Sequence, residues 1–94
     1  MTPVVWTPLA AKQHRLAISG VMLDSPKAAQ SYVREISKQV NGLRRFPCLG
    51  RPGFLKGTRE LVICRTPFYT VYQHDPTEPH VEIQSFQRTS QQRH

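Results

Sequence analysis

The most regular hydrophobic pattern in the chain lies between Ser25 and Pro47. Apolar residues recur there at every third or fourth position, which is the spacing of one face of an α-helix. The positions that share this face are Ala29, Tyr32 or Val33, Ile36, Val40 and Leu43. Ser25 is suited to cap the helix and Pro26 to occupy its first position, whereas Phe46 and Pro47 are suited to end it. The pattern therefore predicts an amphipathic helix of about four turns.

A second amphipathic segment precedes this helix. Thr7 is suited to be its N-cap and Pro8 its first residue. Its apolar face comprises Ala10, Ala17, Ile18 and Val21, with His14 among them. Gly20 weakens the helix near its end. Only a few residues separate the two helices, so they are expected to pack as an antiparallel hairpin.

Short runs of β-branched and aromatic residues predict four strands. Residues 4–6 (VVW) form the first, ahead of the helices. Three more follow the helices at residues 60–64, 68–73 and 80–86, separated by Thr66–Pro67 and by the sequence HDPTEP. Residues 87–94 are polar without periodicity and are expected to form a flexible tail.

This order of elements predicts a single α+β domain over residues 1–94. A short N-terminal strand comes first, then an antiparallel helix hairpin, then a three-stranded meander. The helices would pack on one face of a mostly antiparallel sheet. With 94 residues the core must be small, so a partner is expected to add to the stability of the fold.

Positive charge is in excess along the chain. Thirteen Lys and Arg residues face six Asp and Glu, which gives a net charge of +7. Such a balance favours nucleic acid or an acidic protein as partner. No apolar run reaches the roughly 18 residues of a membrane span, and the N-terminus does not have the pattern of a secretory signal. A cytoplasmic protein without a membrane partner is expected.

Metal and cofactor chemistry find little support in the sequence. Cys48 and Cys64 are too few for a zinc site and are expected to be at least half-buried apolar side chains. His74 and His80 flank a turn that also holds Asp75 and Glu78, but exposed loop histidines are the commoner case. No metal and no cofactor are predicted.

The positive charge concentrates in one segment. Six cations lie between residues 44 and 65, against the single acid Glu60. The candidates for contact with a partner are Arg51, Lys56, Arg59 and Arg65, next to Arg44 and Arg45. The alternative is a solvated loop in which Arg59 has a structural role, either pairing with Glu35 or Glu82 or fixing the loop to the sheet. Gly50, Gly53 and Gly57 indicate tight turns, because no GK[ST] sequence follows them to complete a phosphate-binding loop.

Several segments, taken in order, resemble a known family. They are VVWTPLA near the start, SPKAAQSYVREI in the second helix, LRRFPCLGRPG, GTRELV, and TPFYTVYQHD leading into VEI. Together they are similar to the RelE/ParE superfamily of bacterial type II toxin–antitoxin systems, over roughly residues 3–91. The GRPG and GTREL pair is most similar to the ParE branch. The resemblance implies the same α+β fold and a small basic toxin that an antitoxin holds inactive.

The resemblance implies a target as well. ParE-type toxins act on DNA gyrase and block replication, so gyrase is the expected target and the chain would not be an enzyme. The residues expected to bind the target are Arg51, Lys56, Arg59, Arg65 and Arg88. A cognate antitoxin would bury apolar surface along the helix hairpin or the sheet edge, and the sequence does not specify which residues it contacts.

Two alternatives remain open. In the first, the chain is a RelE-like endoribonuclease that cleaves mRNA in the ribosome, which needs a base, an acid and cations near the phosphate. Arg59, Arg65 and Arg88 would hold the phosphate, and Glu60 and Tyr69 are the candidates for proton transfer. Arg88 stands roughly where nuclease members carry a His, and an arginine cannot serve as the base. In the second, the chain is a non-toxic homologue that only binds antitoxin.

Overall fold

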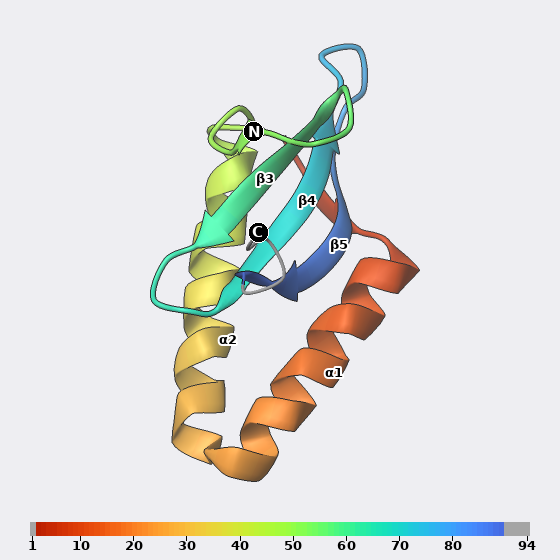
Figure 1. The fold of residues 1–94 in the computed structure, drawn as a ribbon. Helices are drawn as coiled ribbons and strands as arrows, with labels where there is room; N and C mark the ends of the chain where they lie inside the picture. Colours follow the sequence, from red (N-terminus) through yellow and green to blue (C-terminus); the bar gives the residue numbers. More distant parts are fainter. Residues whose placement is uncertain (1, 90–94) are drawn as a thin grey trace.

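The computed structural model describes residues 2–89 of the chain. Two helices, α1 (Pro8–Asp24) and α2 (Pro26–Asn41), form an antiparallel hairpin beside a twisted sheet (Figure 1). The sheet contains β1 (Val4–Trp6), β2 (Arg51–Pro52), β3 (Thr58–Ile63), β4 (Phe68–His74) and β5 (Val81–Arg88). Its strand order is β1-β5-β4-β3-β2, with β1 parallel to β5 and every other pair antiparallel. The predicted α+β architecture is confirmed.

The helix boundaries follow the predicted capping residues. The Thr7 hydroxyl accepts a hydrogen bond from Ala10 N at 3.1 Å, and the Ser25 hydroxyl accepts one from Ala28 N at 3.1 Å. Ser25 also donates its backbone N–H to Val21 O, so this one residue ends α1 and begins α2. The α-helix stops at Asn41, earlier than predicted, and a 3-10 turn at Gly42–Arg44 carries Leu43 into the core.

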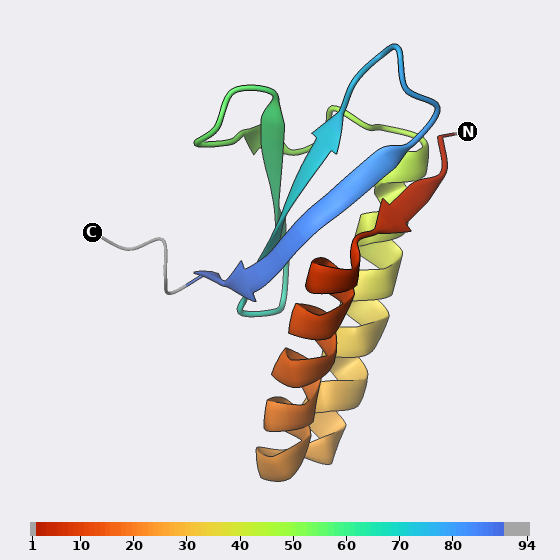
Figure 2. The same cartoon turned by 90° about the vertical axis from the view of Figure 1, so that its right-hand side faces the viewer.

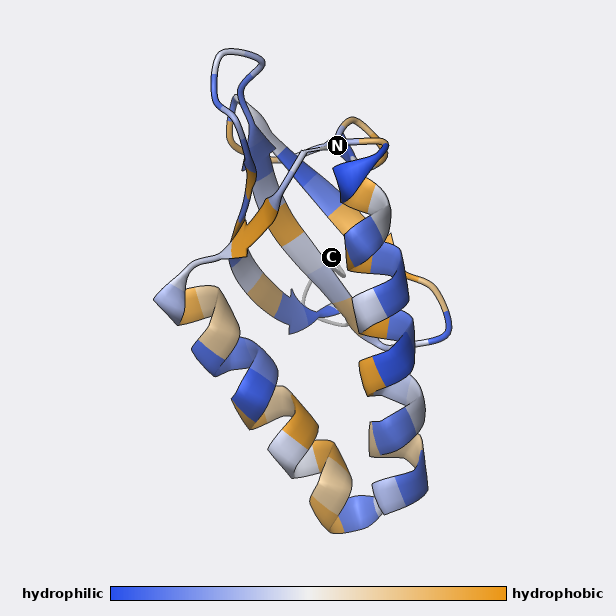
Figure 3. Ribbon diagram, turned by 180° about the vertical axis from the view of Figure 1, so that it is seen from behind, coloured by the Kyte–Doolittle hydropathy of each residue, from blue (hydrophilic) through white to orange (hydrophobic). Residues whose placement is uncertain are grey.

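The core lies between the helix hairpin and the sheet. Its largest fully buried side chains come from α2, the 3-10 turn and the three central strands; they are Tyr72, Phe68, Ile36, Leu43, Ile63, Ile83, Val81 and Thr70. Figure 3 views the molecule from the helix side, where both helices alternate between apolar and polar positions in front of the sheet. The far end of the hairpin extends beyond the sheet (Figure 1), and Leu23 at that end is 89% exposed.

The strands extend beyond their predicted limits at both ends of the meander. β3 begins at Thr58 and pairs with Arg51 and Pro52, which form a short edge strand that the sequence pattern did not predict. A two-residue strand is too short to show alternation, and its proline cannot donate a ladder hydrogen bond.

The expected flexible tail begins later than predicted. Gln87 and Arg88 belong to β5, where they pair with Tyr69 and Phe68. Thr89 donates its backbone N–H to Pro67 O at 2.9 Å. The prediction for residues 87–94 is therefore wrong for its first residues, because β4 offers them a ladder partner. Residues 90–94 lie outside the described part of the chain.

Two further observations bear on the expectations from composition. Within residues 2–89, no helix has the length and apolar character needed to cross a membrane. Cys48 and Cys64 are both exposed, contrary to the expected burial, because each lies where the chain turns away from the core.

Candidate functional site

The segment before β2 is fastened to the core by one tyrosine. The Tyr72 hydroxyl donates to Pro47 O at 2.8 Å and accepts from Gly50 N at 2.8 Å. Burial raises the pKa of Tyr72, so the phenol keeps its proton and both hydrogen bonds. Gly50 has no room for a side chain, since an added Cβ would lie 2.6 Å from Glu60 O and 2.8 Å from the Tyr72 ring. The base of the β2–β3 hairpin is thus closely packed.

Arg59 also holds the segment before β2 against the sheet. Its Nη1 donates to Gly50 O at 2.8 Å and, more weakly, to Cys48 O at 3.5 Å. Of the two structural roles considered for this residue, the ion pair with Glu35 or Glu82 does not form within residues 2–89. Arg59 instead fixes the loop to the sheet, which was the other role. Strand alternation places Arg59 on the same face of β3 as Leu61 and Ile63, beneath the loop that it holds.

The other two cations of the hairpin are exposed. Arg51 pairs with Glu60 across β2 and β3, with Nη2 and Oε1 3.0 Å apart, and 55% of the Arg51 side chain stays exposed. Lys56 lies in the loop between the two strands and is exposed. The hairpin therefore presents positive charge to solvent from a fixed base.

The opposite end of β3 is also basic, but its arginine has a carboxylate partner on a helix. Arg65 adopts a positive φ of 66° in the β3–β4 turn, and its Nη2 lies 2.9 Å from Glu35 Oε1 on α2. Gln39 accepts a hydrogen bond from Cys64 N at 2.8 Å and donates to Cys64 O and to Glu35 Oε1, each at 2.9 Å. Hydrogen bonds from Arg65 and Gln39 lower the pKa of Glu35 to about 2. This group connects the turn to α2.

Arg88 and Tyr69 lie near that same end of the sheet. The Arg88 guanidinium is 5.2 Å from the centre of the Phe68 ring, a cation–π distance, and the residue is exposed. Tyr69 is buried and donates its hydroxyl to Gln87 Oε1 at 3.2 Å. The exposed Arg88 guanidinium thus lies over the ring of Phe68, a residue of the core.

The structure does not gather the candidate nuclease residues. β3 has six residues, so its two ends lie about 17 Å apart at roughly 3.3 Å per residue. Arg59 is at one end, and Arg65 and Arg88 are near the other. Strand alternation and register place Glu60 and Tyr69 on the sheet face that points away from the helices, at diagonal positions of the β3–β4 pair. Glu60 forms an ion pair with Arg51, and the Tyr69 hydroxyl donates to Gln87. Arg59 faces the opposite way.

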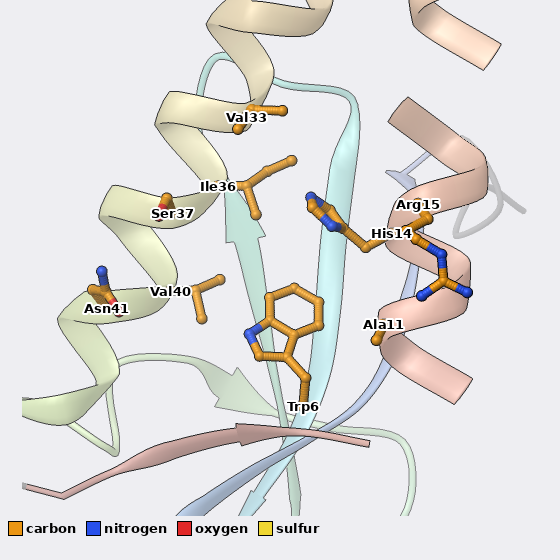
Figure 4. A pocket seen from close by; sticks show the side chains of 9 residues that line it. All are labelled: Trp6, Ala11, His14, Arg15, Val33, Ile36, Ser37, Val40 and Asn41. Carbon is orange, nitrogen blue, oxygen red and sulfur yellow. The ribbon is translucent and has the colours of Figure 1, made fainter. Parts of the chain in front are cut away.

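A pocket of about 340 Å³ opens between the two helices (Figure 4). Trp6 of β1 and His14 of α1 reach into it from one side, and apolar side chains of α2 line the other. The residues that line it are Trp6, Ala11, His14, Arg15, Val33, Ile36, Ser37, Val40 and Asn41. The pocket is therefore mainly apolar, with polar and basic groups among its lining residues.

His14 is the chemically distinctive group in this pocket. Its ring packs 5.3 Å from Trp6 and 5.1 Å from Phe86, centre to centre. Burial lowers its pKa, which favours the neutral imidazole near pH 7. Within residues 2–89 its buried Nε2 has no hydrogen-bond partner. The sequence placed His14 on an apolar helix face, but no local signal could show that this face would border an opening.

A second apolar groove of about 440 Å³ lies on the other side of α2, along the edge of β3. Leu49, Leu61 and Val62 contribute its apolar surface, and Lys38 and Arg51 lie among its lining residues. β2 covers β3 only at Arg59 and Glu60, so the backbone of the following residues lies along this groove at the sheet edge.

The histidines considered for a metal site lie at the β4–β5 connection. Asp75, Glu78, His80 and Glu82 border a polar hollow there with Gln73. Among the described residues, no group of three or more His, Cys, Asp or Glu side chains is arranged to hold a metal ion.

Comparisons with known proteins agree on one family. The family model described as the ParE toxin of the type II toxin–antitoxin system, parDE, matches residues 4–93. A Sinorhizobium fredii protein named "Putative toxin Y4kP" is 42% identical over 50 residues, which are 53% of this chain and 52% of that protein. The match to this curated relative thus spans about half of its length.

A solved structure of the chromosomal ParDE toxin–antitoxin system from P. aeruginosa contains a similar chain. The two chains superpose with a TM-score of 0.81 at 25% sequence identity, covering 94% of this chain and 96% of the other. The likeness extends over the α+β fold of two helices packed on a five-stranded sheet. With the family model matching nearly every residue, the chain belongs to the ParE toxin family of type II toxin–antitoxin systems.

Proposed function

We propose that this chain arrests bacterial growth by binding DNA gyrase and blocking replication, and that a cognate antitoxin neutralises it. Membership of the ParE family is the observation that carries this proposal. The exposed Lys56 of the β2–β3 hairpin supports contact with an acidic protein surface.

The arrangement of side chains favours binding over RNA cleavage. A nuclease needs a base, an acid and cations around one phosphate. Here Glu60 and Tyr69 already have partners in Arg51 and Gln87. The arginines that would hold the phosphate are divided between the two ends of β3, and Arg59 is used to fasten the hairpin.

The antitoxin would bind over α2. The pocket between the helices and the groove beside β3 lie on the two sides of this helix, and both are mainly apolar. Arg15 and Lys38 are among their lining residues, so an amphipathic segment with acidic positions fits by charge. An apolar side chain entering the pocket would pack on the rings of Trp6 and His14.

Purified gyrase gives the direct test. The wild-type chain is expected to inhibit DNA supercoiling, and Lys56→Glu is expected to inhibit less because it reverses an exposed charge of the hairpin. Lys27→Glu, an exposed position on α2, is the control of equal charge change. Equal inhibition by the wild type and Lys56→Glu would remove Lys56 from the contact.

Expression in cells separates the remaining alternatives. DNA and protein synthesis are labelled in parallel during the first minutes after the chain is induced without antitoxin. Early failure of DNA synthesis supports gyrase as target. Early failure of protein synthesis with cleaved transcripts would instead indicate the ribosome, and an absent growth defect would indicate a non-toxic homologue.

A further inference from the structure

The loop between β2 and β3 exposes two large apolar side chains at its tip. Phe54 is 96% exposed and Leu55 is 65% exposed. Single exposed apolar residues are common on protein surfaces. Two adjacent ones, including a phenylalanine that touches almost nothing of its own chain, indicate a surface that another molecule covers. We call Phe54, Leu55 and Lys56 the hairpin tip.

The hairpin tip is held in a defined turn. Gly53 N donates to Thr58 O at 2.8 Å, and the backbone N–H and the hydroxyl of Thr58 donate to Leu55 O at 3.1 and 2.6 Å. Gly57 has a positive φ of 87°, and a Cβ on Gly53 would lie 2.3 Å from the Thr58 hydroxyl. The chain therefore presents the tip side chains on a closed turn, which reduces the ordering cost of binding.

The chemistry of the hairpin tip defines the partner that it fits. Lys56 is the exposed cation of the tip, whereas Arg51 pairs with Glu60 and Arg59 donates to Gly50 O. An aromatic and an aliphatic side chain beside a lysine match an apolar pocket with an acidic rim, the kind of site in which aromatic anchors contribute most to protein–protein binding. Nucleic acid fits less well, because Arg51 is paired with Glu60 and Lys56 alone neutralises few phosphates. Two apolar side chains are also too few for stable membrane anchoring.

The position of the hairpin tip separates it from the pocket between the helices. In Figure 2 the loop before β3 projects to one side of the sheet, whereas α1 and α2 lie on the other. A partner seated between the helices thus leaves the hairpin tip free.

We infer that Phe54 and Leu55 form the apolar anchor by which this toxin enters an acid-rimmed pocket of its protein target. The inference rests on the proposed function in taking gyrase as that target. It adds that the contact depends on apolar insertion at the hairpin tip, with Lys56 contributing at the rim. The tip is a different surface from the pocket between the helices.

The test replaces both anchors with the double variant Phe54→Ser/Leu55→Ser. Supercoiling by gyrase is measured over a series of toxin concentrations. The variant is expected to need at least about tenfold more toxin for half-inhibition, as for loss of an interface hot spot. Leu23→Ser is the matched control, because Leu23 is 89% exposed at the far end of the helix hairpin. It is expected to inhibit like the wild type, and circular dichroism establishes that all three proteins are folded.

A second variant reports the environment of the anchor directly. Phe54→Trp is mixed with gyrase, with duplex DNA alone, or with phosphatidylglycerol vesicles, and the wild type, which retains Trp6, serves as the blank. A blue shift of the tryptophan emission in the mixture with gyrase, and none with DNA or with vesicles, supports the inference. A blue shift with DNA or with vesicles, and none with gyrase, overturns it in favour of a nucleic-acid or a membrane contact.

The outcomes separate this inference from the proposed function. If the wild type inhibits gyrase and the double variant inhibits equally, the anchor is overturned while gyrase stands. If the wild type arrests growth without inhibiting gyrase, the proposed target is wrong. The anchor is then supported when the double variant loses the growth arrest and overturned when it keeps it. A wild-type chain that neither inhibits gyrase nor slows growth overturns both.

Discussion

Basic residues lie at both ends of β3, and the two ends use their charge in different ways. At the N-terminal end of β3, Arg59 holds the base of the β2–β3 hairpin, and Arg51 and Lys56 remain exposed. At the C-terminal end, Arg65 pairs with Glu35 on α2 at 2.9 Å. The first end presents charge and apolar surface to solvent, and the second joins the sheet to a helix.

The difference teaches that the partners of a basic residue decide its role. In the sequence, Arg51, Lys56, Arg59 and Arg65 form one run of candidates for target binding. In the structure, only the hairpin end combines a closely packed base with side chains that have few contacts of their own. A well-fastened base beneath exposed side chains is the arrangement expected of a binding element.

The largest expected effect comes from filling the space at Gly50. In Gly50→Ala the new Cβ would lie 2.6 Å from Glu60 O, and neither the backbone nor the Tyr72 ring can easily move. The free energy of unfolding should fall by about 2–3 kcal/mol, the usual cost of overpacking. Urea denaturation measures it. Gly20→Ala is the matched control: the space around Gly20 is open, and the change should stabilise α1 by about 0.5–1 kcal/mol.

Removing one hydroxyl should loosen the same base. Tyr72→Phe leaves Gly50 N and Pro47 O without the partner that each has at 2.8 Å. The expected loss of stability is about 2 kcal/mol, the penalty for buried polar groups left unpaired. Thermal denaturation of Tyr72→Phe and Tyr69→Phe side by side checks it. The Tyr69 hydroxyl donates to the side chain of Gln87. A loss no greater in Tyr72→Phe than in Tyr69→Phe would contradict the proposed importance of the hairpin base.

The other end of β3 should respond less. Gln39→Ala removes hydrogen bonds to both backbone groups of Cys64, and these bonds are exposed to solvent. The free energy of unfolding should fall by about 1 kcal/mol. Gln30→Ala on the exposed surface of α2 controls for the change in helix propensity. If the two variants unfold at the same urea concentration, Gln39 does not stabilise the turn.

The ion pair at that end should make stability depend on pH. Folding lowers the pKa of Glu35 from its ordinary 4.5 to about 2, so the unfolded chain binds more protons in this range. The stabilisation is complete above pH 4.5 and is lost as the pH falls toward about 2. Melting temperatures of the wild type should exceed those of Glu35→Gln at pH 6 and converge with them near pH 2. A gap of constant size across this range would show that Glu35 does not titrate in this way.

The smallest expected effect is at the hairpin tip. Phe54→Ser should change the free energy of unfolding by less than about 0.5 kcal/mol, because a side chain that is 96% exposed contributes little to the core. Its melting temperature should match that of the wild type while its binding to a target changes. A clear drop in stability would mean that Phe54 packs on its own chain, and the contrast between base and tip would be lost.

Local chemistry along the chain was sufficient to predict both helices and four of the five strands. The Thr7–Pro8 and Ser25–Pro26 pairs set the starts of both helices, and the spacing of Ala29, Ile36 and Val40 set the buried face of α2. These features depend on residues three or four positions apart, so a sequence reveals them directly. The order of elements and the segments that resemble the RelE/ParE superfamily then predicted the fold and the family.

The pairing of residues far apart in the chain could not be predicted from these local patterns. Arg51–Pro52 becomes a strand only because Arg59 and Glu60 lie beside it, and Gln87–Arg88 extends β5 only because β4 continues opposite. The pocket beside His14 exists because Trp6 and α2 meet around it.

By itself, the sequence determined where the helices begin, which of their faces are apolar, where basic charge accumulates, and to which family the chain belongs. Tertiary structure alone decided that Arg65 would bind Glu35, that Arg59 would bind the carbonyl of Gly50, and that Phe54 would remain in solvent. The physical reason is range. Capping and periodicity act within a turn or two of chain, whereas ion pairs, hydrogen bonds and burial depend on which distant segments the sheet brings together.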